Sequence, residues 1–113
     1  MGQIIVIANQ KGGVGKTTTA VNLSACIAAA GRRVLLVDLD PQGNATSGLG
    51  LDKSALKHTL YDVLVNDLPV EEATIPTLIE ALKIVPANKN LVGAEIELVE
   101  ETNREFRLRR ALQ

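Results

Sequence analysis

Residues 10–18 of this chain read Gln-Lys-Gly-Gly-Val-Gly-Lys-Thr-Thr, and they stand between two stretches of different character. Before them, Ile4 to Ala8 is a short apolar, β-branched run, typical of a strand that is buried on both faces of a parallel sheet. After them, apolar side chains recur at helical spacing from Lys16 to Ala30. A glycine-rich turn between a buried strand and a helix predicts an α/β unit whose loop can bind phosphate.

The next segment returns the chain to the sheet. Gly31 is well placed to end the helix in a left-handed conformation, and Val34 to Val37 is a second apolar run. A strand that returns after a crossover helix forms a right-handed βαβ unit with parallel strands. The connection from Asp38 to Gly50 is dense in turn-forming residues and is predicted to be a long, mobile loop on the surface.

The later elements follow weaker signals. Thr59 is predicted to cap a short helix that runs through Asn66, and residues 69–76, bounded by two prolines, are predicted to be a polar connector. Leu82 to Val85 predicts a third strand, and Asn90 a cap for an amphipathic helix. The chain ends over residues 104–113 in what reads as an unfinished helix with no strand behind it.

The glycine-rich loop has the side chains that phosphate binding requires. Its glycines allow successive backbone N–H groups to turn inward around phosphate oxygens, and the start of the following helix adds a positive dipole end. Lys16 would neutralise the β and γ phosphates, Thr17 is placed to bind magnesium, and Thr18 to reach the α phosphate. An ordinary turn with two solvated lysines is the alternative. The predicted nucleotide-binding set is Lys11, Gly12, Gly13, Val14, Gly15, Lys16, Thr17 and Thr18.

One position departs from the ordinary phosphate-loop pattern. That pattern begins with a glycine five residues before Gly15, where this chain has Gln10, and a second lysine, Lys11, precedes the glycine pair instead. The string resembles the deviant Walker A motif of the ParA/MinD superfamily. The resemblance implies that Lys11 reaches across a nucleotide-sandwiched dimer to the partner's phosphates, much as an arginine finger does. Plain electrostatic help from Lys11 remains the alternative.

Two carboxylates follow the second predicted strand. Asp38 and Asp40 lie at the carboxyl end of that strand, which is the edge where open α/β sheets bind ligands. A carboxylate there can orient an attacking water or hold the hydration shell of magnesium, and alternation puts both side chains on one side if the strand continues. The alternative is that Asp38 caps a turn and Asp40 is solvated before Pro41.

Residues 34–50 resemble the corresponding region of the Soj/ParA partitioning ATPases. The resemblance implies that Asp40 positions the hydrolytic water and that Asp38 supports the magnesium site, directly or through a water. It also implies that Pro41 to Ser47, called the switch segment below, senses the γ phosphate. The implied catalytic residues are Lys11, Lys16 and Asp40, and the implied metal-binding residues are Thr17 and Asp38.

The resemblance extends over nearly the whole chain but over only the first half of the family's length. We therefore expect an α/β fold, a P-loop NTPase-type parallel sheet with flanking helices, in truncated form. Residues 1–113 are expected to be the N-terminal part of a single P-loop ATPase domain whose C-terminal half is absent, since three strands alone leave the sheet uncovered.

The function implied by the resemblance is an ATP-binding partitioning ATPase, with ATP and magnesium as cofactors. Such a protein forms an ATP-dependent homodimer, binds DNA nonspecifically, and hydrolyses ATP with a ParB-like activator in chromosome or plasmid segregation. A cytoplasmic, nucleoid-associated protein without membrane attachment is expected. The alternatives are an incomplete, weak or inactive nucleotide-binding fragment, and another deviant Walker ATPase such as a MinD-like protein.

The composition of the chain further limits the functions that can be predicted for it. A formal net charge of -1 provides no global basic field for DNA, and no apolar run approaches the roughly 20 residues that span a bilayer. Cys26, the single cysteine, excludes an internal disulfide and is predicted to be a small buried filler of the first helix. His58 stands without metal-ligating neighbours and is predicted to be a surface residue.

Overall fold

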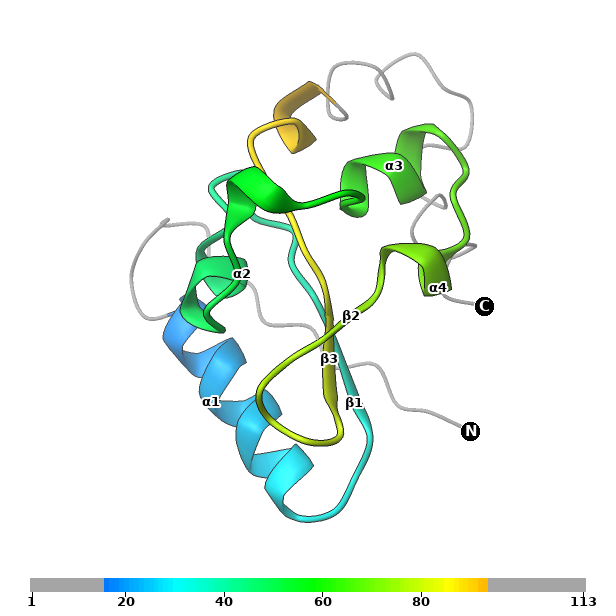
Figure 1. The fold of residues 1–113 in the computed structure, drawn as a ribbon. Helices are drawn as coiled ribbons and strands as arrows, with labels where there is room; N and C mark the ends of the chain where they lie inside the picture. The colour runs from blue at the N-terminus through cyan, green and yellow to red at the C-terminus, as the bar shows by residue number, and fades with distance from the viewer. Residues whose placement is uncertain (1–15, 94–113) are drawn as a thin grey trace.

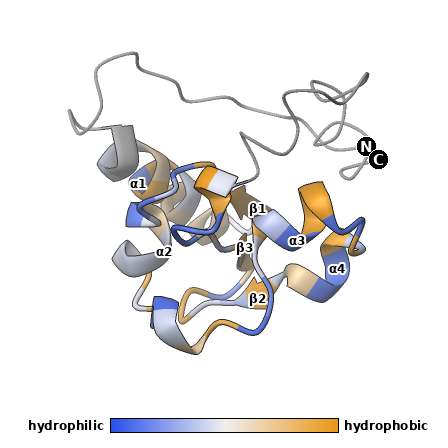
Figure 2. Cartoon of the chain, turned by 90° about the horizontal axis from the view of Figure 1, so that it is seen from above, coloured by the Kyte–Doolittle hydropathy of each residue, from blue (hydrophilic) through white to orange (hydrophobic). Residues whose placement is uncertain are grey.

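The computed structural model describes residues 16–93, and every structural statement below concerns these residues. The predicted strand Ile4–Ala8, the loop up to Gly15 and the helix predicted over residues 104–113 lie outside them. Of the helix predicted to follow Asn90, only residues 91–93 are described, and they are helical. The described elements are α1 (Lys16–Ala29), β1 (Val34–Val37), α2 (Asn44–Gly48), the 3-10 helix η1 (Lys53–Ala55), α3 (Leu60–Val65), α4 (Val70–Ala73), β2 (Ile75–Pro76) and β3 (Leu82–Val85). Figures 1 and 2 show α1 and α2 on one side of the strands, and α3 and α4 on the other.

Helix α1 ends where the sequence predicts. Gly31 has φ 88°, in the left-handed region that favours glycine. The Gly31 N–H donates to the Ala28 carbonyl at 3.0 Å and the Arg32 N–H to the Ile27 carbonyl at 3.3 Å, which together form a Schellman motif. This cap turns the chain back toward β1, and the predicted end of the helix is confirmed.

The sheet has the strand order β1-β3-β2. β1 and β3 are parallel, with Val34 opposite Leu82 and Val37 opposite Val85, which agrees with the expected parallel sheet. β2 is antiparallel to β3, with Ile75 opposite Ile84. The polar connector predicted for residues 69–76 is therefore wrong in part, because it contains α4 and β2. Pro76 is compatible with a strand because β2 is at the edge of the described sheet, where a missing N–H donor is tolerated.

The core lies around the central strand. Leu82, Ile84 and Val85 are buried on β3, whereas Leu35 on β1 is 42% exposed and is opposite Lys83, which is also exposed. Buried apolar side chains pack together in a cluster on the α3 side of the sheet. The members of this cluster are Leu60, Val63, Leu64, Ala73, Val85, Ala87 and Leu91. The three members of this cluster that lie on α3 form the buried face of that helix.

Two predictions about the surface are wrong. The connection from Asp38 to Gly50 is not simply a surface loop, because it contains α2, whose Ala45 and Thr46 are buried. Cys26 is exposed rather than buried. The buried residues of α1 are Ser24 and Ala28, four positions apart on one face, and Cys26 lies about 200° around the helix from Ser24.

Candidate functional site

The candidate site lies at the carboxyl ends of β1 and β3. The Asp38 N–H donates to the Val85 carbonyl at 3.1 Å, so the chain leaves both parallel strands at the same edge. α2 lies beside the first half of α1 (Figure 1), and the position of a Cβ on Gly48 is 3.8 Å from Cγ2 of Val21. The start of α1 and the connection that carries Asp38 and Asp40 therefore share one edge of the sheet, as ligand sites in open α/β folds do.

Asp38 is 4% exposed, and its carboxylate is held from three directions. Oδ2 accepts from the Thr46 N–H at 3.0 Å and from Thr46 Oγ1 at 2.7 Å, and Oδ1 accepts from the Asp40 N–H at 3.0 Å. A carboxylate has about four lone-pair positions, so about one remains, on Oδ1. Asp38 thus caps a turn, as the alternative interpretation held, and still has an acceptor position for a ligand.

Asp40 is also fixed by the loop that follows it. Oδ1 accepts from the Gln42 N–H at 2.9 Å, and Oδ2 accepts from Asn44 Nδ2 at 2.7 Å and from the Asn44 N–H at 3.3 Å. β1 ends at Val37, so the expectation that Asp38 and Asp40 share one side of a continuing strand does not hold. The half-buried Asp40 carboxylate faces the turn into α2 instead.

Thr46 is the residue that sequence reasoning missed. It is 0% exposed, its hydroxyl donates to Asp38, and the same oxygen accepts from the Ala87 N–H at 3.0 Å. The partner at Ala87 is 41 positions away along the chain. Nothing in the local sequence distinguishes Thr46 from the other turn formers around it, so only the tertiary contact identifies it.

The switch segment is fixed to the end of β3 at a second point. Gly43 has φ 63°, and a Cβ added there would lie 2.5 Å from the Ala87 carbonyl oxygen. From η1, Lys53 Nζ donates to the Gln42 carbonyl at 2.5 Å. The segment is therefore packed between β3 and η1.

η1 is itself capped. Its N-cap, Asp52, accepts from Ser54 Oγ at 2.6 Å and from the Ser54 N–H at 3.0 Å. These hydrogen bonds, the side-chain one first, hold the pKa of the Asp52 carboxyl below its ordinary value of 3.8. The cap fixes the turn that carries Lys53.

The predicted phosphate-binding residues lie at the start of α1 or before it. Lys16, Thr17 and Thr18 form the first turn of α1, and the positions from Lys11 to Gly15 lie outside the described residues. The first turn has no acidic residue, so the helix's own side chains leave its positive end available to an anion.

The nearby donors suit magnesium, because Asp38 and Asp40 supply carboxylate oxygens, the ligands that this hard cation prefers. Within residues 16–93 there is no group of three or more histidine, cysteine or acidic side chains that could hold a metal ion. A magnesium ion here would therefore depend on phosphate oxygens and water as well, as nucleotide-bound magnesium does.

His58 has a partly exposed side chain with Nδ1 3.9 Å from Asp62 Oδ2, which fits the predicted surface role.

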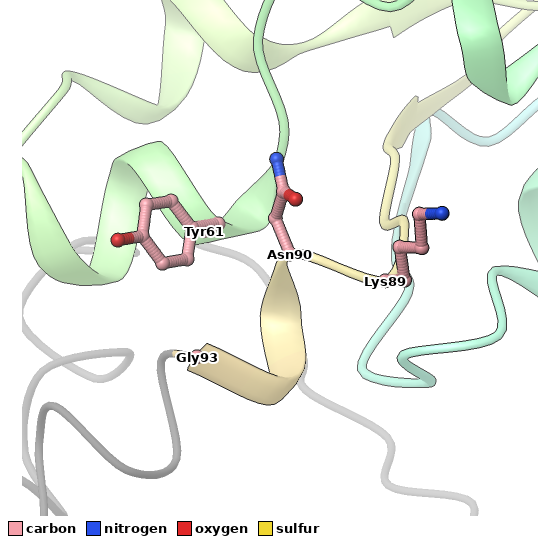
Figure 3. Close-up of a pocket in the computed structure, with 4 residues that line it drawn as sticks. All are labelled: Tyr61, Lys89, Asn90 and Gly93. Atoms are coloured by element: carbon pink, nitrogen blue, oxygen red, sulfur yellow. The ribbon is translucent and has the colours of Figure 1, made fainter.

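A separate pocket lies beyond α3. Tyr61, Lys89, Asn90 and Gly93 line a cavity of about 470 Å³ (Figure 3). Tyr61 comes from α3, and the other three come from the stretch after β3. None of the predicted site residues lines it.

No helix among the described residues is long and apolar enough to cross a membrane.

Comparison with known proteins places the chain in a family. A family model described as an AAA domain matches residues 2–113. The sporulation initiation inhibitor protein Soj of Bacillus subtilis is 59% identical over 113 residues, which are all of this chain and 45% of that protein. The chromosome partitioning protein ParA of Myxococcus xanthus is 58% identical over the same length, 40% of that protein. The chain thus spans less than half the length of these two relatives.

Solved structures agree with the sequence matches. A cobyrinic acid a,c-diamide synthase from Mycobacterium smegmatis, solved with an ATP analogue and magnesium, superimposes with a TM-score of 0.88 at 48% identity, over 93% of this chain and 43% of that one. The cell division ATPase MinD of Pyrococcus furiosus superimposes with a TM-score of 0.74 at 34% identity, over 95% of this chain and 46% of that one. The chain therefore belongs to the AAA domain family, as a member of the ParA/MinD superfamily of deviant Walker A ATPases with ParA and Soj among its relatives.

Proposed function

We propose that this chain binds ATP with magnesium and supplies the phosphate-binding part of a DNA-partitioning ATPase. The observation that carries the proposal is the juxtaposition, at one edge of the sheet, of the start of α1, which bears Lys16, Thr17 and Thr18, with the connection after β1 that carries Asp38 and Asp40. The relatives named for chromosome partitioning, and the neighbour solved with an ATP analogue and magnesium, support it.

The phosphate grip comes from the loop and the first turn of α1. Backbone N–H groups from Gly12 to Gly15 surround the phosphate oxygens, Lys16 neutralises the β and γ phosphates, and Thr18 contacts the α phosphate. Thr17 and Asp38 would hold magnesium, Asp38 directly or through a water, with an acceptor position left on its Oδ1. Magnesium supplies additional charge neutralisation on the phosphates.

Hydrolysis is assigned to two further residues. The Asp40 carboxylate, fixed by the N–H groups of Gln42 and Asn44, has one acceptor position left on Oδ1 with which to orient the attacking water. Lys11 acts across a nucleotide-bound homodimer and counters the charge that develops on the partner's phosphates. Dimerisation and hydrolysis are coupled in this way.

The cycle assigned to the whole protein has three steps. ATP binding forms the dimer, the dimer binds DNA nonspecifically, and a ParB-like activator stimulates hydrolysis, which releases it. Because the net charge of this chain is -1, DNA binding would depend on a local basic patch, on dimer geometry or on residues outside this sequence. The protein acts in the cytoplasm, at the nucleoid.

The first test is nucleotide binding, measured by titration calorimetry with ATP and magnesium, with turnover followed in the same samples. Lys16→Ala is expected to lose at least tenfold in ATP affinity, about 1.4 kcal/mol, because the charge opposite the phosphates is removed. Lys57→Ala is the matched control, since Lys57 is an exposed lysine outside the site, and it should bind ATP as wild type does.

The outcomes separate the alternatives. Binding that depends on Lys16, with turnover that depends on Asp40 and DNA binding that requires ATP, supports the partitioning ATPase. Binding without turnover supports a catalytically inactive nucleotide-binding chain. ATP-dependent chemistry without DNA binding would favour a MinD-like or synthase-like role. Equal ATP affinity in wild type and Lys16→Ala would contradict the proposal.

A further inference from the structure

We propose that Thr46 is a positioning residue for this site, and that its buried hydroxyl holds the Asp38 carboxylate in the orientation in which it receives magnesium. The inference rests on the proposed function, in which Asp38 supports the magnesium ion. Thr46 itself lies on α2 and acts through Asp38.

The geometry makes Thr46 a bridge between three segments. Its N–H and its hydroxyl both donate to Oδ2 of Asp38, at 3.0 and 2.7 Å, at the end of β1. The hydroxyl oxygen in turn accepts from the N–H of Ala87, at 3.0 Å, just after β3. One side chain therefore fixes a carboxylate from β1 against the backbone that follows β3.

The hydrogen bonds of Thr46 are buried, so the loss of any one of them should be costly. Asp38 is 4% exposed, and both Thr46 and Ala87 are 0% exposed, so water cannot readily replace a lost partner. Hydrogen bonds to an ionised carboxylate are among the stronger ones in proteins, and a buried N–H left without an acceptor is costly. Removal of the hydroxyl would take one of three donors from Asp38 and leave the Ala87 N–H unpaired.

The bridge also decides which acceptor position of Asp38 is open. With Oδ2 occupied by both donors of Thr46, and with Oδ1 accepting from the Asp40 N–H, the remaining position is on Oδ1. Without the Thr46 hydroxyl as a donor to Oδ2, the Asp38 carboxylate could rotate and would populate more than one orientation. Since Thr46 belongs to the switch segment, any movement of that segment also moves the donors of Asp38.

The test compares Thr46→Val, which keeps the shape and removes the hydroxyl, with Thr46→Ser, which keeps the hydroxyl, in the full chain. The readouts are kcat, KM for ATP, the magnesium concentration for half-maximal turnover, and the midpoint of thermal unfolding. Thr46→Val is expected to lower kcat by about tenfold. It should also raise the magnesium requirement several-fold, with KM changed less. Thr46→Ser should stay close to wild type in kcat and in magnesium requirement.

A double variant shows whether Thr46 acts through Asp38, and a third threonine variant controls for the loss of a hydroxyl. The double variant Thr46→Val with Asp38→Asn should turn over no more slowly than Asp38→Asn alone, because both changes disable the same group. Thr74→Val is the control for a lost threonine hydroxyl: Thr74 Oγ1 donates to the Val70 carbonyl at 2.7 Å in α4, so its loss should lower stability and leave the magnesium requirement unchanged.

Each result has one meaning. If wild type hydrolyses ATP and Thr46→Val lowers only the unfolding midpoint, Thr46 is a structural residue and the inference is overturned, whereas the proposed function stands. If wild type does not hydrolyse ATP, there is no magnesium-dependent turnover for Thr46 to support and the inference is overturned; the proposed nucleotide binding fails with it only if wild type does not bind ATP either. Should Thr46→Val not fold, Thr46→Cys replaces the hydroxyl with a weak thiol donor, and a magnesium requirement equal to that of Thr46→Ser would overturn the inference.

Discussion

At the scale of the residue, Gly43 has the least room for a side chain among the glycines of residues 16–93. Its φ of 63° disfavours other residues, and a Cβ would lie 2.5 Å from the Ala87 carbonyl oxygen and 2.7 Å from Cδ of Lys53. Gly43→Ala is expected to destabilise the fold by about 2–5 kcal/mol, because left-handed strain adds to a collision with backbone. Urea unfolding followed by circular dichroism measures the change.

Gly50 provides the matched control for this prediction. It also has a positive φ, 84°, but a Cβ there would meet nothing within 4 Å. Gly50→Ala should therefore cost only the conformational strain, about 1–2 kcal/mol. Equal losses in the two variants would show that the contact with Ala87 does not fix the switch segment.

At the scale of the element, α3 depends on its N-terminal cap. The Thr59 hydroxyl accepts from the Tyr61 N–H at 3.2 Å, and the Thr59 N–H donates to Asp62 Oδ2 at 3.0 Å, as parts of a capping box. Thr59→Ala should lower the free energy of unfolding by about 1–2 kcal/mol, since the end of a buried helix loses its acceptor.

The control for the cap keeps the hydroxyl. Thr59→Ser retains the acceptor for the Tyr61 N–H and should lose clearly less stability than Thr59→Ala in the same chemical denaturation experiment. If serine and alanine cost the same, the buried methyl group of Thr59, rather than the cap, stabilises this end of α3.

At the scale of the whole molecule, β3 is the central strand of the described sheet. Substitutions on its buried face and on its exposed face should change the free energy of unfolding by different amounts. Ile84 is 0% exposed at the centre of the three-stranded sheet, whereas its neighbour Lys83 is exposed. Ile84→Ala is expected to cost about 2–5 kcal/mol, because it leaves a cavity between the strand and its neighbours.

Lys83→Ala is the control on the same strand. It should change the free energy of unfolding by no more than about 0.5 kcal/mol, since the side chain faces solvent. A single cooperative transition in both variants, followed by urea titration, would indicate that the sheet unfolds as one unit. A small loss in Ile84→Ala would contradict the central position of β3 in the core.

Features that depend on local periodicity and on short-range backbone chemistry could be predicted from the sequence. The helix from Lys16, its end at Gly31, the strands Val34–Val37 and Leu82–Val85, and the Thr59 cap all match the structure. Helical spacing, β-branched runs and capping residues act over a few positions, so they can be read from the chain directly. The family and its phosphate-loop motif followed from the same local string.

The contacts that hold the candidate site could not be predicted from the sequence, because they form between segments that are far apart along the chain. The antiparallel β2, the burial of α2, and the outward position of Cys26 depend on what packs against each segment, which local periodicity does not encode. The same holds for Thr46, whose role depends on Asp38, 8 positions away, and on Ala87, 41 positions away. A hydroxyl in a turn-rich stretch becomes a buried bridge because two parallel strands end side by side, and that proximity exists only in the folded chain.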